Sequence, residues 1–142
     1  MLVLDTNLVS ELMRPHPAPA VLAWVGAQPM MEMAITAVST MEIRFGIHVL
    51  PEGKRRVELD RKFSELIVQG FADRVLPFDS HAAEACADIR AMRQRTGRRI
   101  ATEDAMIAAI AKAHGATVVT RDENGFAGCG VPIINPWETP DE

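Results

Sequence analysis

The chain has 142 residues, of which 48% are hydrophobic and 24% are charged. This balance is typical of a soluble globular protein and excludes a disordered or collagen-like chain. Fifteen Lys and Arg stand against 19 Asp and Glu, giving a formal net charge of −4. Bulk charge alone therefore argues against a nucleic-acid partner, because proteins that bind duplex nucleic acid usually carry an excess of positive charge.

Length and residue usage indicate one domain, residues 1–142, in a reducing cytoplasm. A chain of this length fits the usual allowance of ~150 residues for one domain. Cys86 and Cys129 lie far apart in the sequence, which makes a disulfide scaffold or a thiolate zinc site a poor expectation. The first residues lack the basic segment of a signal peptide. No apolar run approaches the ~18 residues of a membrane span, so we expect no membrane association.

Short apolar runs alternate with segments of helical periodicity along the chain. Strands are predicted over residues 2–4, 33–36, 75–78, 117–120 and 131–134. Helices are predicted from Thr6 to before Pro15, from Pro19 to near Pro29, from Ser39 through Leu50, from after Gly53 to near Gly70, from Ser80 to before Gly97 and from about Thr102 to His114. This alternation predicts an α/β fold with a central, mainly parallel β-sheet flanked by α-helices.

Four acidic residues fall where a parallel sheet of this kind binds ligands, beyond the carboxyl ends of its strands. Asp5 follows the first strand, Glu42 lies in the first turn of the helix after the second strand, Asp104 opens the helix from Thr102, and Asp122 follows the strand from residue 117. Converging carboxylates repel one another unless a cation lies among them. Oxygen-only ligands favour hard ions such as Mg²⁺ or Mn²⁺, which can ionise water and neutralise a phosphodiester under attack.

Each acid also has a purely structural explanation. Asp5 can cap the helix that begins at Thr6. Ser39 and Glu42 match the S-x-x-E capping box, and Asp104 gains from the helix dipole in a first helical turn. Asp122 opens a sequence typical of a turn. Their shared location, rather than any single acid, favours a functional site.

Four motifs in order carry a resemblance to a known family: Leu4-Asp5-Thr6-Asn7, Ser39-Thr40-Met41-Glu42-Ile43-Arg44-Phe45-Gly46, Thr102-Glu103-Asp104-Ala105-Met106-Ile107-Ala108-Ala109 and Thr120-Arg121-Asp122. Phe126 follows a little downstream, and the likeness extends to Asn135-Pro136-Trp137. The chain resembles the PIN-domain ribonucleases, specifically VapC toxins of the FitB-like branch. The resemblance implies a PIN-like fold and an endoribonuclease that depends on Mg²⁺ or Mn²⁺.

On the family pattern Asp5, Glu42 and Asp104 are the core acids and Asp122 falls at the fourth position. Asp5 and Asp104 would hold the main metal, and Glu42 and Asp122 would complete its shell or hold a second ion. The implied reaction is attack of a metal-activated water on phosphorus, with the 3′-oxygen leaving. Family members often carry a further Asp where this chain has Gly125. The resemblance also assigns supporting roles to three hydroxyls, those of Thr6, Ser39 and Thr120.

The resemblance further implies two partners, a structured RNA substrate and a cognate VapB-like antitoxin, with assembly as a homodimer or a larger toxin–antitoxin complex. An RNA-binding role is predicted for five arginines just before the Asp104 helix, although a solvated helix end is an equal alternative: Arg90, Arg93, Arg95, Arg98 and Arg99. The charged run from Lys54 to Lys62 is better explained as a salt-bridged solvent face. Four aromatic residues between Pro19 and Phe71 could line a partner groove, although core packing is the commoner fate: Trp24, Phe45, Phe63 and Phe71.

Two other functions are weighed against the nuclease. A phosphatase with an Asp nucleophile needs a second Asp two residues after Asp5, where this chain has Asn7, and Lys112 is a poor candidate for its supporting Lys. A catalytically silent PIN-like module that binds RNA or protein stays open because of Gly125. The net charge no longer excludes RNA, since setting aside the four proposed metal ligands leaves 15 acids against 15 Lys and Arg.

Overall fold

The computed structural model describes residues 1–138, so the last four residues of the predicted domain lie outside the described range. Five strands form one sheet in the order β3-β2-β1-β4-β5, and all four pairings are parallel. The strands are β1 (Leu2–Leu4), β2 (Met33–Thr36), β3 (Val75–Leu76), β4 (Thr117–Val119) and β5 (Ile133–Ile134). The predicted α/β class with a parallel central sheet is confirmed.

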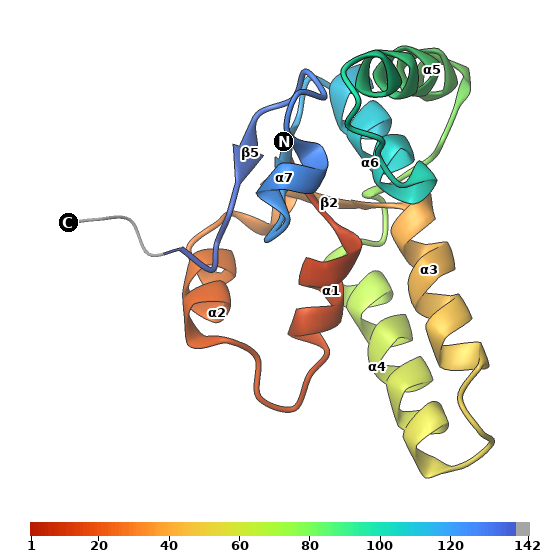
Figure 1. Ribbon diagram of the computed structural model, residues 1–142. Coiled ribbons are helices and arrows are strands. Elements are labelled where there is room, and N and C mark those ends of the chain that lie inside the picture. The colour runs from red at the N-terminus through yellow and green to blue at the C-terminus, as the bar shows by residue number, and fades with distance from the viewer. Residues whose placement is uncertain (139–142) are drawn as a thin grey trace.

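Helices cover both faces of this sheet (Figure 1). On one side lie α5 (Ser80–Arg95) and α6 (Thr102–Ala113), with the short α7 (Glu123–Phe126) beside them. The other side is covered by α1 (Thr6–Leu12), α2 (Pro19–Gly26) and α4 (Lys54–Gly70), while α3 (Ala37–His48) packs alongside α4. A short 3₁₀ helix, Met30–Glu32, leads into β2.

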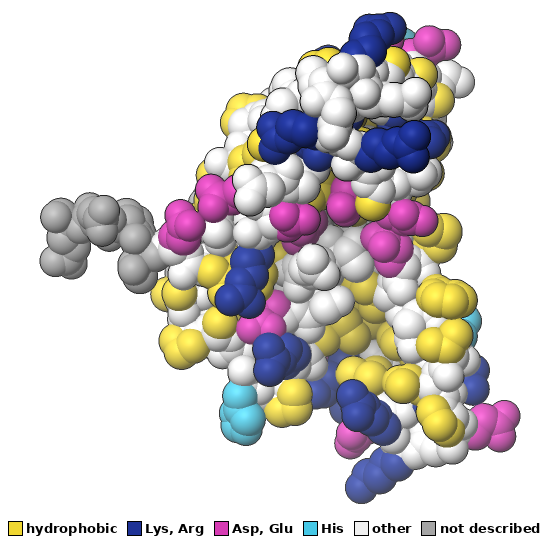
Figure 2. All heavy atoms as spheres, viewed as in Figure 1, with side chains coloured by type: hydrophobic (Ala, Val, Ile, Leu, Met, Phe, Trp, Pro, Cys, Tyr) yellow, Lys and Arg dark blue, Asp and Glu magenta, His cyan; other side chains and the backbone are white. Residues whose placement is uncertain are grey.

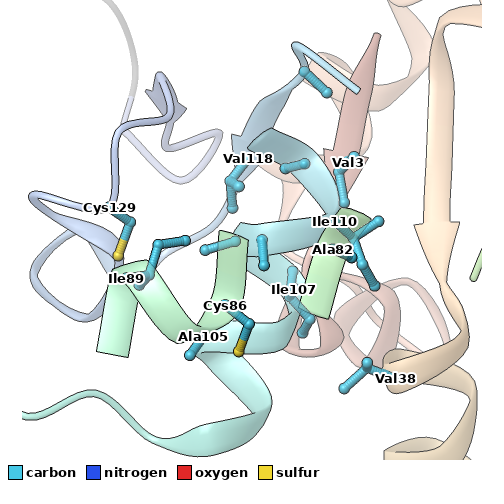
Figure 3. Packing of buried hydrophobic residues seen from close by; sticks show 14 of the residues in the cluster. Val3, Val38, Ala82, Cys86, Ile89, Ala105, Ile107, Ile110, Val118 and Cys129 are labelled. Carbon is cyan, nitrogen blue, oxygen red and sulfur yellow. The ribbon is translucent and has the colours of Figure 1, made fainter. Parts of the chain in front are cut away.

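Alternation of side chains along the strands divides the core into two clusters. Val3 and Val118 face α5 and α6, where they meet a layer of alanines and aliphatic residues (Figure 3). Leu4 and Val119, the next residue in each strand, face α1, α2 and α4 and pack with Phe63. Because both faces of the sheet are buried, its strands are continuous apolar runs, as parallel strands usually are.

Both cysteines are buried free thiols, as expected of a chain without a disulfide scaffold. Among residues 1–138, no helix has the length and apolar character needed to cross a membrane.

Element ends differ from the predicted ones at several places. Thr36, not Ser39, caps α3, because the Thr36 hydroxyl accepts a hydrogen bond from the Ser39 amide (3.1 Å) and the helix begins at Ala37. The predicted capping box is therefore wrong, and Glu42 lies in the second turn of α3 rather than the first. The predicted strand 75–78 ends at Leu76, because Pro77 has no amide hydrogen for the ladder. The predicted turn after Asp122 is the short helix α7.

Candidate carboxylate site

Asp5 leaves the carboxyl end of β1 and is almost fully buried, with 3% of its surface exposed. Its carboxylate accepts the Leu8 amide (2.9 Å), which caps α1, and the Thr120 hydroxyl (2.6 Å) at the end of β4. Burial raises the pKa of Asp5, and the two hydrogen bonds oppose that rise, while nearby Asp122 and Glu42 add to it. The net result is a raised pKa. Asp5 therefore does cap α1, but the cap uses only one of its carboxylate oxygens. The other oxygen accepts from Thr120, which is distant in sequence and follows the neighbouring strand β4.

Glu42 is partly buried on α3 and is held by hydroxyls from two elements. The Thr6 hydroxyl, in the first turn of α1, donates to Glu42 Oε1 (2.7 Å). The Ser39 hydroxyl lies 2.9 Å from that of Thr6. Since the single hydrogen of Thr6 is given to Glu42, the Ser39 hydroxyl donates to Thr6. This chain of hydroxyls fixes Glu42 beside the beginning of α1, where Asp5 lies.

Asp104 lies in the first turn of α6, as predicted, and is partly buried. Burial and the neighbouring carboxylates, those of Asp122, Glu42, Asp5 and Glu103, raise its pKa to about 6. Within residues 1–138 its side chain accepts no hydrogen bond, so no fixed contact orients it. A carboxyl group that ionises this reluctantly in a partly open site is typical of functional positions.

Asp122 follows β4 and is exposed. Its amide donates to the Thr120 hydroxyl (2.9 Å), and its carboxylate accepts the Gly125 amide (3.0 Å), which caps α7. A Cβ atom on residue 125 would lie 2.3 Å from Asp122 Oδ2. Gly125 therefore allows the Asp122 carboxylate to fold back over the beginning of α7, an arrangement that any larger residue at position 125 would disrupt.

The four acids come from four segments that follow or adjoin the carboxyl ends of the parallel strands. Acidic side chains gather across the middle of the face shown in Figure 2. Their mutual effect on the pKa of Asp104 shows that they share one electrostatic environment. In the described part of the chain none of the four pairs with Lys, Arg or the N-terminus. The oxygen-only donors and the unneutralised charge fit a hard divalent cation.

The side chains are not, however, drawn together around a single point. Among residues 1–138, no three acidic, His or Cys side chains converge closely enough to hold one metal ion as they stand. Asp5 and Glu42 are fixed by their hydrogen bonds, whereas Asp104 is not.

A cleft of about 620 Å³ opens beside Thr6 and Glu42, between α1, α3 and α4. Its walls are mainly apolar, and basic residues stand around them, as hydrophobic and basic side chains do on the lower part of the face in Figure 2. The lining includes Met13, Arg14, Ile43, Ile47, Arg55, Leu59 and Lys62. Arg61 of the charged run pairs with Glu65 as the solvent-face interpretation predicts. Arg55 and Lys62 instead line the cleft, a role that depends on how α4 packs and that its charge pattern does not show.

The predicted arginine cluster separates into one buried and four exposed members. Arg90, Arg95, Arg98 and Arg99 are exposed. Arg93 is 5% exposed, and its guanidinium donates to the backbone carbonyls of Arg98 (2.5 Å), Ala127 (2.6 Å) and Gly125 (3.3 Å). Burial and these contacts leave Arg93 less available to RNA than its four exposed neighbours, because its Nε and Nη1 groups donate inside the protein.

The four aromatic candidates for a partner groove differ in their exposure to solvent. Phe63 and Phe71 are buried in the core, and Trp24 packs partly against it. Phe45 is 67% exposed on the outer side of α3, one helical turn from the exposed Met41 and Val49.

Comparison with known proteins places this arrangement in a family context. The family model described as "PIN domain" matches residues 2–128. The chain is 44% identical over 138 residues to VapC ribonuclease Y4jK of Sinorhizobium fredii, covering 97% of this chain and 99% of that protein. It is 39% identical over 137 residues to Toxin FitB of Neisseria gonorrhoeae, covering 96% and 99%. The crystal structure of FitAcB from Neisseria gonorrhoeae superposes with a TM-score of 0.91 at 38% identity, covering 98% of this chain and all of that one.

Proposed function

Because the chain belongs to the PIN-domain family, we propose that it is an endoribonuclease that acts as the toxin of a toxin–antitoxin pair in the cytoplasm. The observation that carries the proposal is the grouping of Asp5, Glu42, Asp104 and Asp122 at one edge of the sheet, with their charge unneutralised by any basic side chain of residues 1–138. A purely structural role accounts for the cap at Asp5, but it does not account for Asp104, whose ionisation these neighbours oppose.

The proposed cofactor is Mg²⁺ or Mn²⁺, held mainly by Asp5 and Asp104 with Glu42 and Asp122 completing the set. When bound, such an ion offsets the charge of a phosphodiester and promotes the ionisation of water. Binding would also remove the repulsion that raises the pKa of Asp104, since a cation among carboxylates favours their ionised form.

Three hydroxyl side chains orient the proposed metal ligands. Thr120 holds one oxygen of Asp5 and the amide of Asp122, and thereby couples β1 to the segment after β4. Thr6 and Ser39 hold Glu42 in the same way from α1 and α3. The matched motifs contain no His or Lys, so the positive charge that a phosphate needs would come from exposed arginines and from a bound metal ion. We assign the phosphate contacts to Arg90, Arg95, Arg98 and Arg99.

The proposed protein partner is a VapB-like antitoxin, in an assembly built on a homodimer or larger complex. Support comes from the likeness to FitB and to the FitAcB structure. The cleft between α1, α3 and α4 has the apolar lining that a protein segment can bury, and it opens at Thr6 and Glu42. A segment docked there would lie against the proposed site and block it.

The test is to induce the wild-type chain and its Asp5→Asn variant in cells and to map the 5′ ends of total RNA. We expect discrete new ends with the wild type only, and their loss when the antitoxin is co-expressed. Asn at position 5 keeps an oxygen for the Leu8 amide, so the variant should fold. The same RNA ends with Asp5→Asn and wild type would contradict the proposal, as would the absence of new ends with either.

A further inference from the structure

A second hollow, of about 430 Å³, adjoins the carboxylate site at Asp122. It is lined by Asn7, Glu11, Arg121, Asp122 and Trp137. Asn7 comes two residues after Asp5, and Arg121 stands between Thr120, which binds Asp5, and Asp122. A ligand in this hollow would therefore touch residues that are chain neighbours of the proposed metal ligands.

Arg121 and Trp137 form the wall of this hollow as a stacked pair. The guanidinium carbon of Arg121 lies 5.5 Å from the centre of the Trp137 ring, within the range of a cation–π contact. The pairing of β4 with β5 sets this geometry, since the Thr120 amide donates to the Ile134 carbonyl (2.9 Å). The Trp137 amide in turn donates to Asn135 Oδ1 (3.0 Å). This hydrogen bond fixes the backbone of Trp137, and the side chain of Trp137 is partly buried against the core cluster that contains Leu4 and Val119.

The polar groups of the hollow remain available. Within residues 1–138 the Arg121 side chain forms no hydrogen bond and no ion pair, although it is close enough to Glu11 to help lower the pKa of that residue. Glu11 itself is held by Arg14 (3.0 Å) and by the Ala18 amide (3.2 Å). The exposed amide of Asn7 can both donate and accept. The hollow therefore offers an aromatic ring, a planar cation with unused donors and an amide.

We propose that this hollow binds one nucleotide of a single-stranded RNA next to the bond that is cut. The Trp137 ring stacks on the base, the Arg121 guanidinium binds a phosphate, and Asn7 contacts the edge of the base. The volume lies near the lower end of the range for small-ligand sites, which suits one nucleotide and not a duplex. This inference rests on the proposed ribonuclease function and adds a substrate-positioning site to it.

The pair could instead serve stability alone, because cation–π contacts on protein surfaces do so. That alternative makes no use of a hollow beside the acids, and it predicts no response of Trp137 to RNA. The two explanations therefore differ in a direct spectroscopic observable.

The experiment uses a full-length Trp24→Phe, Asp5→Asn variant, in which Trp137 is the only Trp of the chain and cleavage is expected to be absent. A mixed-sequence single-stranded oligoribonucleotide is titrated in EDTA, with Trp137 fluorescence and the anisotropy of a labelled copy followed together. We expect quenching of Trp137 that saturates with binding. An otherwise identical oligonucleotide with abasic positions should bind more weakly and quench much less.

Substitutions test the same site independently. Trp137→Ala should weaken binding about ten-fold, which corresponds to about 1.4 kcal/mol and to the lower range for stacking of one base. Trp137→Phe should keep most of the affinity, which guards against a folding defect in the Ala variant. Arg121→Ala should weaken binding and lower its salt dependence, whereas Arg61→Ala, on the outer side of α4, should do neither.

Binding by anisotropy with unchanged Trp137 fluorescence, or with equal affinity for the Trp137→Ala variant, would overturn the nucleotide site and leave the ribonuclease proposal standing. If a protein partner covers the hollow instead, RNA will leave the fluorescence unchanged and the inference fails in the same way. Failure of the oligonucleotide to bind, together with no RNA cleavage by the wild type, would overturn both.

Discussion

Asp104 is the residue whose surroundings say most about the site. It is partly buried, it faces three other proposed ligands, and its pKa is raised to about 6. Its position in the first turn of α6 would by itself favour the ionised form, because a helix N-terminus attracts negative charge. Burial and carboxylate repulsion outweigh that attraction. Ionised Asp104 therefore destabilises the metal-free protein, and the same concentration of negative charge favours binding of a cation.

The raised pKa of Asp104 predicts how stability depends on pH in the absence of metal. The pKa of Asp104 is near the usual aspartate value of 3.8 in the unfolded chain and is raised to about 6 in the folded chain, so the folded state binds the proton more tightly. The free energy of unfolding should thus rise as the pH falls from 7 through 6 towards 4. Urea unfolding in EDTA at pH 5, 6 and 7 measures this. Asp104→Asn should flatten the rise, and an unchanged pH profile in that variant would contradict the assignment.

Thr120 should be costly to replace, because its buried hydroxyl serves two partners. Thr120→Val keeps the shape but removes the donor to Asp5 and the acceptor for the Asp122 amide. We expect a loss of about 1–3 kcal/mol in the free energy of unfolding, the usual cost of leaving a buried polar group unpaired. The matched control is Thr117→Val at the beginning of β4, where the residue is partly exposed, and it should change stability by less than about 0.5 kcal/mol. Equal stability of the two variants would show that the Thr120 hydroxyl contributes nothing.

Residue identity alone could predict the acids but not the roles of all the basic residues. Asp5, Glu42, Asp104 and Asp122 follow strands or open helices, and strand order in a parallel fold then brings them together. Arg93 looks like its four neighbours in the sequence, and only the packing of α5 against α7 shows that it is buried.

At the scale of elements, Arg93 connects three segments that bear on the site. Its guanidinium binds carbonyls of the loop before α6 and of α7 and the residue after it. The loop leads to Asp104, and α7 is capped by Asp122. The buried guanidinium of Arg93 therefore links the loop that leads to Asp104 with the helix α7 that Asp122 caps.

Arg93→Met should loosen both segments at once. Losing the guanidinium leaves up to three backbone carbonyls without their donor, so we expect a loss of at least about 2 kcal/mol in the free energy of unfolding. Faster amide hydrogen exchange over residues 96–104 and 122–128 should accompany that loss. Arg95→Met is the control, since Arg95 lies on the same helix but is exposed. A stability change no larger than that of the control would contradict the role of Arg93 in holding the two segments together.

Elements were predictable where hydrophobic periodicity decides them and less so at their ends. The strands and the long helices follow from apolar patterns, and His114-Gly115 ends α6 as expected. The beginning of α3 was not predictable from the capping box, because both Thr36 and Ser39 are good caps and the end of β2 selects Thr36. The helix α7 has only four residues, too few to show a helical period.

For the whole molecule, the distribution of charge matters more than its sum. The net charge of −4 equals the charge of the four proposed metal ligands. Acidic side chains form a band across the face shown in Figure 2, with Lys and Arg on both sides of it. Long-range attraction of RNA would come from those flanking cations, while a bound divalent ion would neutralise the band itself. Bulk composition hides this arrangement, because it averages over the surface.

Divalent cations should stabilise the folded protein, and this stabilisation should increase as the carboxyl groups of the proposed site ionise. We expect Mn²⁺ to bind the folded state in preference to the unfolded chain, so the melting temperature should rise with its concentration. The rise should be larger at pH 7.5 than at pH 5.5, where Asp104 is mostly protonated. Differential scanning fluorimetry measures this, with Asp88→Asn, an exposed acid on α5, as the control that retains the effect. An equal Mn²⁺ shift in Asp5→Asn and wild type would place the ion elsewhere.

The most direct measurement is the Mn²⁺-dependent cleavage of RNA by rigorously purified protein, compared between the wild type and the Asp5→Asn, Asp104→Asn and Asp88→Asn variants. We predict cleavage by the wild type and by Asp88→Asn that EDTA abolishes. The other two variants should be inactive, with circular dichroism spectra like that of the wild type. Cleavage that persists in Asp5→Asn or Asp104→Asn, or that does not depend on the metal, would contradict the carboxylate site.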